Sequence, residues 1–136
     1  MLNHLFVYGT LRKEKDGALH PFLGNKAVYI GKASIPGKLY QVNTYPGAVP
    51  APFQSNHVVY GEVYRLLKPE QILRILDDYE ECATHFPQPH EYQRLPETVT
   101  LSDGKRIDAW VYWFRHSVKG LRQIKSGDYF DLKMPN

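Results

Sequence analysis

Several features that define other protein classes are scarce or missing in this chain of 136 residues. Its one cysteine, Cys82, has no partner for an internal disulfide, which argues against a disulfide-rich secreted domain and fits a reducing compartment. No apolar run approaches the roughly 18 residues of a membrane helix. The first residues also lack the basic start and long apolar core of a signal peptide. We therefore expect a cytoplasmic protein without a membrane partner.

The sequence also lacks a cluster of basic residues and a set of histidines or acidic residues at the spacing of a metal site. The formal net charge is only +3, and lysine and arginine form no block or stripe of the kind that binds nucleic acid. His85 and His90 lie near acidic residues, but no helical spacing of four residues pairs them as metal ligands. The sequence thus predicts no nucleic-acid partner and no metal, while a small anionic ligand is compatible with its charge.

Tyrosine, proline and glycine are abundant, with ten residues of each. This balance favours strands and turns over a helical bundle. The length suits one domain spanning residues 1–136, large enough to bury roughly two thirds of its unfolded surface.

About six β-strands are expected. The clearest runs from Val58 to Leu66, where Gly61 indicates either a bulge or a bend that curls the sheet, and Glu62 is expected to face outward. Asp103 and Gly104 predict a hairpin turn. Short connections favour antiparallel pairing, and six strands can close into a small barrel. The remaining strands are predicted at 5–8, 27–32, 38–42, 97–101 and 107–114, with a turn at 35–37 and a loop at 45–50.

One main helix is predicted to begin at residues 68–70, because Pro69 and Glu70 suit a first turn, and to end near residues 78–81. Its apolar residues recur every three or four positions. The end of this helix carries four acidic residues, where the helix dipole is already negative: Asp77, Asp78, Glu80 and Glu81. A broken local rule suggests function, whereas the simpler interpretation is a solvated acidic patch. The fold class predicted is α+β, a small mixed, mainly antiparallel barrel with this helix at its side.

A second candidate for function is the strand and turn from Leu5 to Arg12. Apolar residues form the strand, and Gly9 ends it. Thr10 and Leu11 then offer backbone N–H groups without an acidic side chain, which is typical of an anion-binding turn. The alternative is an ordinary strand that ends at a glycine.

Together these stretches resemble the γ-glutamylcyclotransferase-like family, including its AIG2-like and γ-glutamylamine cyclotransferase branches. Tyr8-Gly9-Thr10-Leu11 is similar to the family's Tyr-Gly-Ser/Thr-Leu signature, and Leu76-Asp77-Asp78-Tyr79-Glu80 resembles its Leu-Asp-x-x-Glu-Gly motif. Further similar segments follow in order along most of the chain: 38–40 with 45–47, 60–64, 92–94, 109–112 and 126–129. The resemblance implies the family's fold, a mixed β-barrel flanked by helices.

The resemblance also implies an intramolecular reaction. The α-amine of a γ-glutamyl compound attacks its own γ-carbonyl, which gives 5-oxoproline and a freed amine or amino acid, without metal or organic cofactor. Glu80 matches the family's catalytic glutamate, the general acid/base. The backbone N–H groups of Gly9, Thr10 and Leu11 are candidates to hold the substrate's carboxylate and the oxyanion. The candidate pocket-lining residues are Tyr8, Tyr40, Tyr92 and Tyr112.

One departure from the family pattern is Glu81, which stands where the family usually has glycine. The helix exit is therefore expected to run differently, which bears on the leaving group. A catalytically inactive module that binds a small metabolite in the same pocket is the alternative function. A structural partner protein that uses its aromatic surface is a third.

Overall fold

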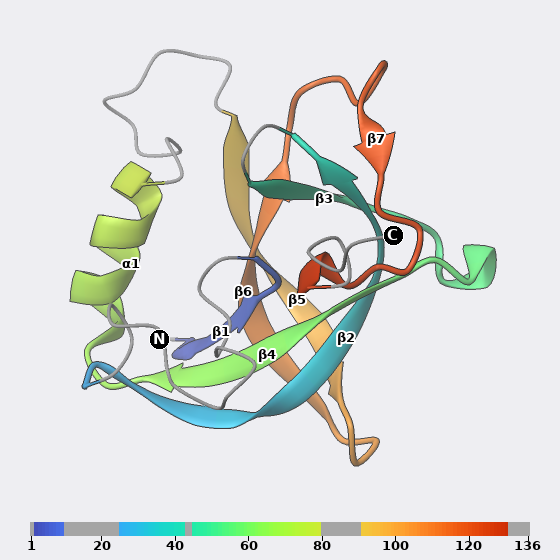
Figure 1. Ribbon diagram of the computed structural model, residues 1–136. Coiled ribbons are helices and arrows are strands. Elements are labelled where there is room, and N and C mark those ends of the chain that lie inside the picture. The colour runs from blue at the N-terminus through green and yellow to red at the C-terminus, as the bar shows by residue number, and fades with distance from the viewer. Residues whose placement is uncertain (1, 10–24, 43–44, 80–90, 131–136) are drawn as a thin grey trace.

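The computed structural model describes residues 2–9, 25–42, 45–79 and 91–130. Seven strands and one α-helix occur in these residues, and Figure 1 shows the helix standing beside the curled sheet. Strand and helix bounds are β1 (His4–Val7), β2 (Ala27–Gln41), β3 (Pro46–Pro50), β4 (Val58–Leu66), α1 (Pro69–Tyr79), β5 (Tyr92–Leu101), β6 (Arg106–Phe114) and β7 (Arg122–Gln123), with a short 3₁₀ helix, η1 (Phe53–Ser55).

Five strands close into a barrel. Their order is β2-β4-β1-β6-β5, and the pairing of β5 with β2 completes the ring. Strand β1 runs parallel to β6, and all other pairs are antiparallel. The short strands β3 and β7 both pair with the second half of β2. The predicted mixed, mainly antiparallel barrel with one flanking helix is therefore confirmed.

Two hydrophobic clusters hold the fold together. One face of all five barrel strands contributes to the first, which fills the barrel around Phe6, Val63 and Trp113. The second lies between the barrel and the apolar face of α1, whose Ile72 and Leu73 are almost fully buried. Burial of each such side chain contributes about 1.5–3 kcal/mol, so the helix is fixed mainly by this face.

The hairpin and the helix lie where the sequence predicts them. Strands β5 and β6 pair from Thr100 and Arg106 outward, and Gly104 in the turn has a positive φ of 92°. Helix α1 begins at Pro69 and ends at Tyr79. No helix among the described residues is long and apolar enough to span a membrane.

Two predictions about β2 and β3 are wrong. Residues 35–37 are not a turn but part of the 15-residue strand β2, and residues 46–50 are not a loop but strand β3. The strand changes partner here: Pro36 is the last residue opposite β4, and Gly37 is the first opposite β3. A proline lacks the N–H of a ladder, and a Cβ at Gly37 would lie 2.9 Å from the Val49 carbonyl oxygen. Proline and glycine therefore mark a partner exchange rather than a reversal.

The bulge is also elsewhere than predicted. Pairing of β2 with β4 shifts register between Tyr29 and Gly31, whereas Gly61 pairs regularly with Ala33. Glycine is required at position 61 for another reason, because a Cβ there would lie 2.2 Å from the Val7 carbonyl oxygen. Close approach of strand β1 thus explains this glycine.

Candidate active site

Tyr112 on β6 joins the end of strand β1 to the last turn of helix α1. Its backbone carbonyl accepts a 2.6 Å hydrogen bond from the Tyr8 hydroxyl. Its own hydroxyl donates to Asp77 Oδ1 at 2.7 Å. Tyr8 and Tyr112 are each only 7% exposed, so the first hydrogen bond is shielded from water and the second, to the partly exposed Asp77, is shielded in part. One side chain therefore fixes the helix end relative to the strand that precedes the glycine turn.

Arg94 on β5 holds the same helix residue from the other side. Its Nε and terminal nitrogen donate to the two oxygens of Asp77 at 2.8 and 3.0 Å, in a bidentate ion pair. The two side chains are only 23% and 19% exposed, respectively. The guanidinium also lies 4.3 Å from the ring centre of Trp110. The bidentate ion pair and the contact with the Trp110 ring together fix the orientation of the guanidinium group. Because Asp77 is bound to this group, the last turn of α1 is fixed relative to β5. We call Tyr8, Tyr112, Asp77 and Arg94 the Tyr112 network.

The start of strand β3 packs against the end of β1. A Cβ at Gly9 would lie 2.9 Å from Pro46 Cγ, so only glycine fits this contact without a shift. The Pro46 carbonyl accepts a 2.8 Å hydrogen bond from the Tyr92 hydroxyl, and the Ala48 N–H donates to the Tyr8 hydroxyl at 3.2 Å. Tyr8 and Gly9 therefore meet Tyr92 and Tyr112, which are distant from them in the sequence, in one region.

The predicted site residues divide into three groups. Tyr8, Tyr92 and Tyr112 lie together, but each hydroxyl donates to a protein group. Tyr40 is half-buried on β2, opposite Gly47 and Gln123, and among the described residues no hydrogen bond joins it to this region. Thr10, Leu11 and Glu80 lie outside the described residues, so their roles stay predictions, as does the effect of Glu81.

Glu62 is the residue whose position the sequence analysis misjudged. It is expected to face outward, yet only 4% of it is exposed, and Tyr64 donates a 3.1 Å hydrogen bond to Oε1. In register it lies between Val7 of β1 and Lys32 of β2. The middle of β4 is buried on both faces, so alternation along the strand gives no outer face. The one signal that could have indicated a buried carboxylate is a glutamate within a strand that is otherwise mostly apolar.

The described residues offer no cluster of three His, Cys, Asp or Glu side chains that could hold a metal ion. His85 and His90 lie in the part of the chain that the structure does not describe.

Comparison with known proteins identifies the family. The family model for "Gamma-glutamyl cyclotransferase, AIG2-like" matches residues 5–131. The chain is 37% identical to the Escherichia coli K12 "Gamma-glutamylcyclotransferase family protein YtfP", over 93% of this chain and 96% of that protein. It is 34% identical to the mouse "Gamma-glutamylaminecyclotransferase", over 80% of this chain and 76% of that protein.

The fold agrees with these relatives. The crystal structure of a mouse AIG2-like protein superimposes with a TM-score of 0.65 at 27% identity, covering 87% of this chain and 81% of the mouse chain. The barrel, the flanking helix and the match over nearly all of the sequence lead to one conclusion. This chain belongs to the γ-glutamyl cyclotransferase, AIG2-like family.

Proposed function

We propose that this chain is a γ-glutamyl cyclotransferase that releases 5-oxoproline and a free amine or amino acid from a γ-glutamyl compound. Family membership and the names of its relatives support a cyclotransferase function in general. The observation that carries the proposal is the Tyr112 network. It ties the last turn of α1, which leads directly into Glu80, to the end of β1, which leads directly into the glycine turn.

In the proposed reaction the substrate's α-amine nitrogen forms a bond to the γ-carbon, and the bond from that carbon to the leaving nitrogen breaks. The amine must first lose a proton, because an ammonium group has no free electron pair. Glu80 accepts this proton and returns it to the leaving nitrogen. The second proton, which the attacking nitrogen loses once the new bond has formed, is also taken up by the leaving nitrogen, so the amine departs as an ammonium ion and the carboxylate is regenerated without an outside reagent. Folding the glutamyl chain back on itself is a matter of positioning, which a shaped pocket supplies.

Negative charge in this reaction needs hydrogen-bond donors. We assign the backbone N–H groups of Gly9, Thr10 and Leu11 to the substrate carboxylate and to the oxyanion that forms on the γ-carbon. The contact between Gly9 and Pro46 supports this assignment, because it anchors the start of the turn. A rigid turn stabilises an oxyanion better than a mobile one, since its dipoles need not reorient during the reaction.

The tyrosines have a different task in this proposal. Since the hydroxyls of Tyr8, Tyr92 and Tyr112 donate to Tyr112 O, Pro46 O and Asp77, these residues act by shaping and holding the site. Tyr40 remains a candidate to contact the leaving group, because its hydroxyl has no hydrogen-bond partner among the described residues.

The proposal is tested by incubating the protein with γ-glutamyl amino acids, glutathione and γ-glutamyl-lysine and measuring 5-oxoproline. We expect product from at least one compound, and Glu80→Gln is expected to lower kcat by about 100-fold or more, as loss of a general acid/base does. Glu70→Gln, at an exposed position in the first turn of the same helix, is the matched control and is expected to retain activity.

Two results would contradict the proposal. Absence of 5-oxoproline from every compound would favour the alternative, a module that binds a small metabolite without converting it. Full activity of Glu80→Gln, together with loss of activity in Glu62→Gln, would move the proton transfer to the buried carboxylate on β4.

A further inference from the structure

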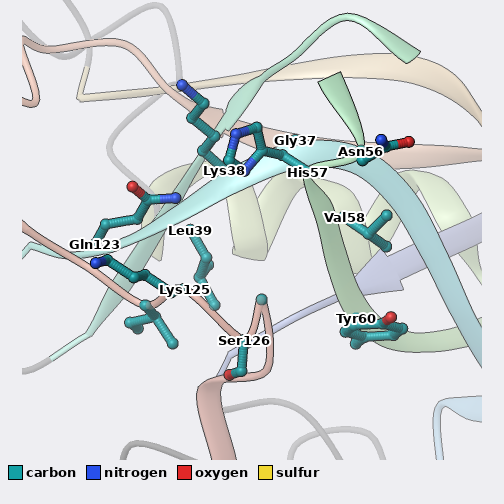
Figure 2. Close-up of a pocket in the computed structure, with 12 residues that line it drawn as sticks. Gly37, Lys38, Leu39, Asn56, His57, Val58, Tyr60, Gln123, Lys125 and Ser126 are labelled. Carbon is teal, nitrogen blue, oxygen red and sulfur yellow. The ribbon is translucent and has the colours of Figure 1, made fainter. Parts of the chain in front are cut away.

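A second region of the molecule has the features of a ligand site. A pocket of about 100 Å³ opens between strand β2, the connection from η1 into β4, and the segment from β7 to Gly127, and Figure 2 shows side chains from all three. None of its lining residues belongs to the Tyr112 network. We call it the basic pocket; its polar side chains are Lys38, Asn56, His57, Gln123, Lys125 and Ser126.

The charge of the basic pocket is of one sign. Two lysines, the half-buried Lys38 and the exposed Lys125, and one histidine, His57, are among the residues that line the pocket, and no acidic residue is. Within the described parts of the chain, none of these three side chains forms an ion pair or a hydrogen bond. Asp128 is the acidic residue nearest to Lys125 in the sequence, and its Oδ1 accepts a hydrogen bond from the Phe130 N–H. Basic side chains without a counter-charge attract an anion, more strongly in a concave site than on an open surface.

Neutral donors complete the site. Asn56 and Gln123 carry amide groups, and each amide offers two N–H donors. The Ser126 hydroxyl is held within its own turn, because it accepts a 3.2 Å hydrogen bond from the Asp128 N–H and donates to the Asp128 carbonyl at 3.4 Å. An oxyanion with several acceptor oxygens can use both the charges and these donors.

The walls of the pocket are joined by the backbone. Gly37 N–H donates to the His57 carbonyl at 3.0 Å, and Ile124 N–H donates to the Leu39 carbonyl at 2.7 Å. Tyr60 N–H donates to the Gly127 carbonyl at 2.8 Å. These three hydrogen bonds connect β2, β4 and the C-terminal segment in pairs. The pocket is therefore preorganised, and a ligand would not have to order its walls.

The size of the pocket limits what it can hold. At about 30 Å³ per water molecule in the liquid, the pocket has room for about three waters. Sites for whole drug-sized molecules occupy roughly 300–1,000 Å³, so a complete metabolite does not fit inside. We propose that the basic pocket binds a phosphoryl group, either as free phosphate or as the phosphate end of a larger molecule that extends into solvent. This site goes beyond the proposed cyclotransferase function and does not depend on it.

The proposal is tested by titrating the full chain with inorganic phosphate at constant ionic strength and recording amide chemical shifts by NMR. Saturable shifts are expected at Gly37, Leu39 and Gly127, whose backbones form the walls. Lys38→Ala and Lys125→Ala are each expected to weaken binding about tenfold, because each removes one charge-assisted interaction. The control Lys105→Ala removes the same charge from the exposed hairpin turn and is expected to bind phosphate like the parent chain.

Two further ligands are compared with inorganic phosphate. Acetate is expected to bind at least tenfold more weakly than phosphate, because it has one charge and two oxygens. A hexose monophosphate that binds more tightly than inorganic phosphate would support the phosphate end of a metabolite, and the reverse order would support free phosphate.

Several results would overturn the site. These are shifts that do not saturate, an equal loss of affinity in Lys105→Ala and Lys38→Ala, or acetate binding as tight as phosphate. Because the substituted lysine side chains form no ion pair or hydrogen bond within the described residues, these variants are expected to remain folded, and their unfolding midpoints check this directly.

Discussion

The Tyr112 network and the basic pocket differ in whether their charged side chains are paired within the protein. In the network, Asp77 accepts hydrogen bonds from Tyr112 and from Arg94, and the groups are largely shielded from water. In the basic pocket, Lys38 and Lys125 have no counter-charge among the described residues. Polar side chains that are hydrogen-bonded to each other fix the position of the elements that carry them. Charged side chains without such a partner are available to bind a ligand. The first region is therefore suited to positioning a reaction, and the second to binding an anion.

The largest effect is expected from Gly127→Ala, which breaks the basic pocket. Gly127 has a φ of 75°, and a Cβ there would lie 1.8 Å from the Val58 carbonyl oxygen. Backbone strain and the clash together are expected to lower the free energy of unfolding by about 3–5 kcal/mol. Phosphate binding would be lost as the walls separate. Urea denaturation measures the stability, and the NMR titration measures the binding.

Gly104→Ala is the control for this substitution. Gly104 also has a positive φ, 92°, but a Cβ there meets nothing within 4 Å. Only the conformational cost of about 1 kcal/mol is expected. Equal losses at the two glycines would show that close packing around Gly127 contributes nothing to the stability of the pocket.

Asp77→Asn is expected to have the next largest effect, because it breaks the Tyr112 network. An amide cannot accept all the hydrogen bonds that the carboxylate accepts, and it leaves Arg94 without its counter-charge. We expect a loss of about 2 kcal/mol in the free energy of unfolding and a larger fall in kcat than rise in KM. Glu70→Gln, which makes the same change of charge at an exposed position of the same helix, should change stability by no more than about 0.5 kcal/mol. Similar values for the two variants would rule out a special role of the network.

Tyr112→Phe tests the Tyr112 network by removing a single hydrogen bond, so its expected effect is smaller than that of Asp77→Asn. The substitution removes the hydroxyl that donates to Asp77, but the backbone carbonyl still accepts from Tyr8. A loss of about 1 kcal/mol is expected, the usual net contribution of one hydrogen bond, because Asp77 keeps its ion pair with Arg94. Tyr60→Phe, at an exposed tyrosine, is expected to be neutral in the same urea denaturation. An unchanged stability of Tyr112→Phe would mean that Arg94 alone fixes the helix end.

His4 is expected to give the smallest effect, a dependence of stability on pH. Burial lowers the pKa of His4 below its usual 6.5, and the positive charge of Arg65, opposite in register, lowers it further. The unfolded chain then binds the proton more readily than the folded chain. The free energy of unfolding should therefore fall as pH drops from about 8 to about 5, mainly below the ordinary histidine pKa.

The variant His4→Gln isolates this contribution. Its unfolding free energy should depend less on pH than that of the parent chain, measured by urea denaturation across the same range. This variant is also the background control for any pH series on the basic pocket, which contains a second imidazole, His57. A steeper pH dependence in His4→Gln would contradict the sign derived from the lowered pKa.

Local signals in the sequence predicted elements well where one rule dominated. Pro69 and the apolar periodicity gave the correct bounds of helix α1, and Asp103-Gly104 gave the correct hairpin. The same kind of signal failed at Pro36 and Gly37, where two strands exchange partners along a continuous β2. In the sequence, a proline followed by a glycine has the same appearance at a turn as at a partner exchange. At both kinds of site the regular hydrogen-bond ladder is interrupted, so the missing N–H of proline and the missing Cβ of glycine are tolerated.

Glu62 shows a second limit of the sequence. Alternation along a strand separates inner from outer residues only when one face meets water. In the middle of β4 both faces are covered, so a carboxylate there is buried although the pattern suggests exposure. The candidate site has the same limit: four predicted residues meet, but only the fold shows that the tyrosine hydroxyls are already engaged.

The sequence by itself determined the family, the barrel class, the helix and the hairpin, because these depend on short-range patterns and on the order of motifs along the chain. Tertiary structure alone decided which residues face each other. It brought Tyr8, Asp77 and Arg94 together through Tyr112, and it gathered Lys38, His57 and Lys125 around one pocket. Contacts between residues so distant in sequence arise only when the sheet closes, and no local pattern records that closure.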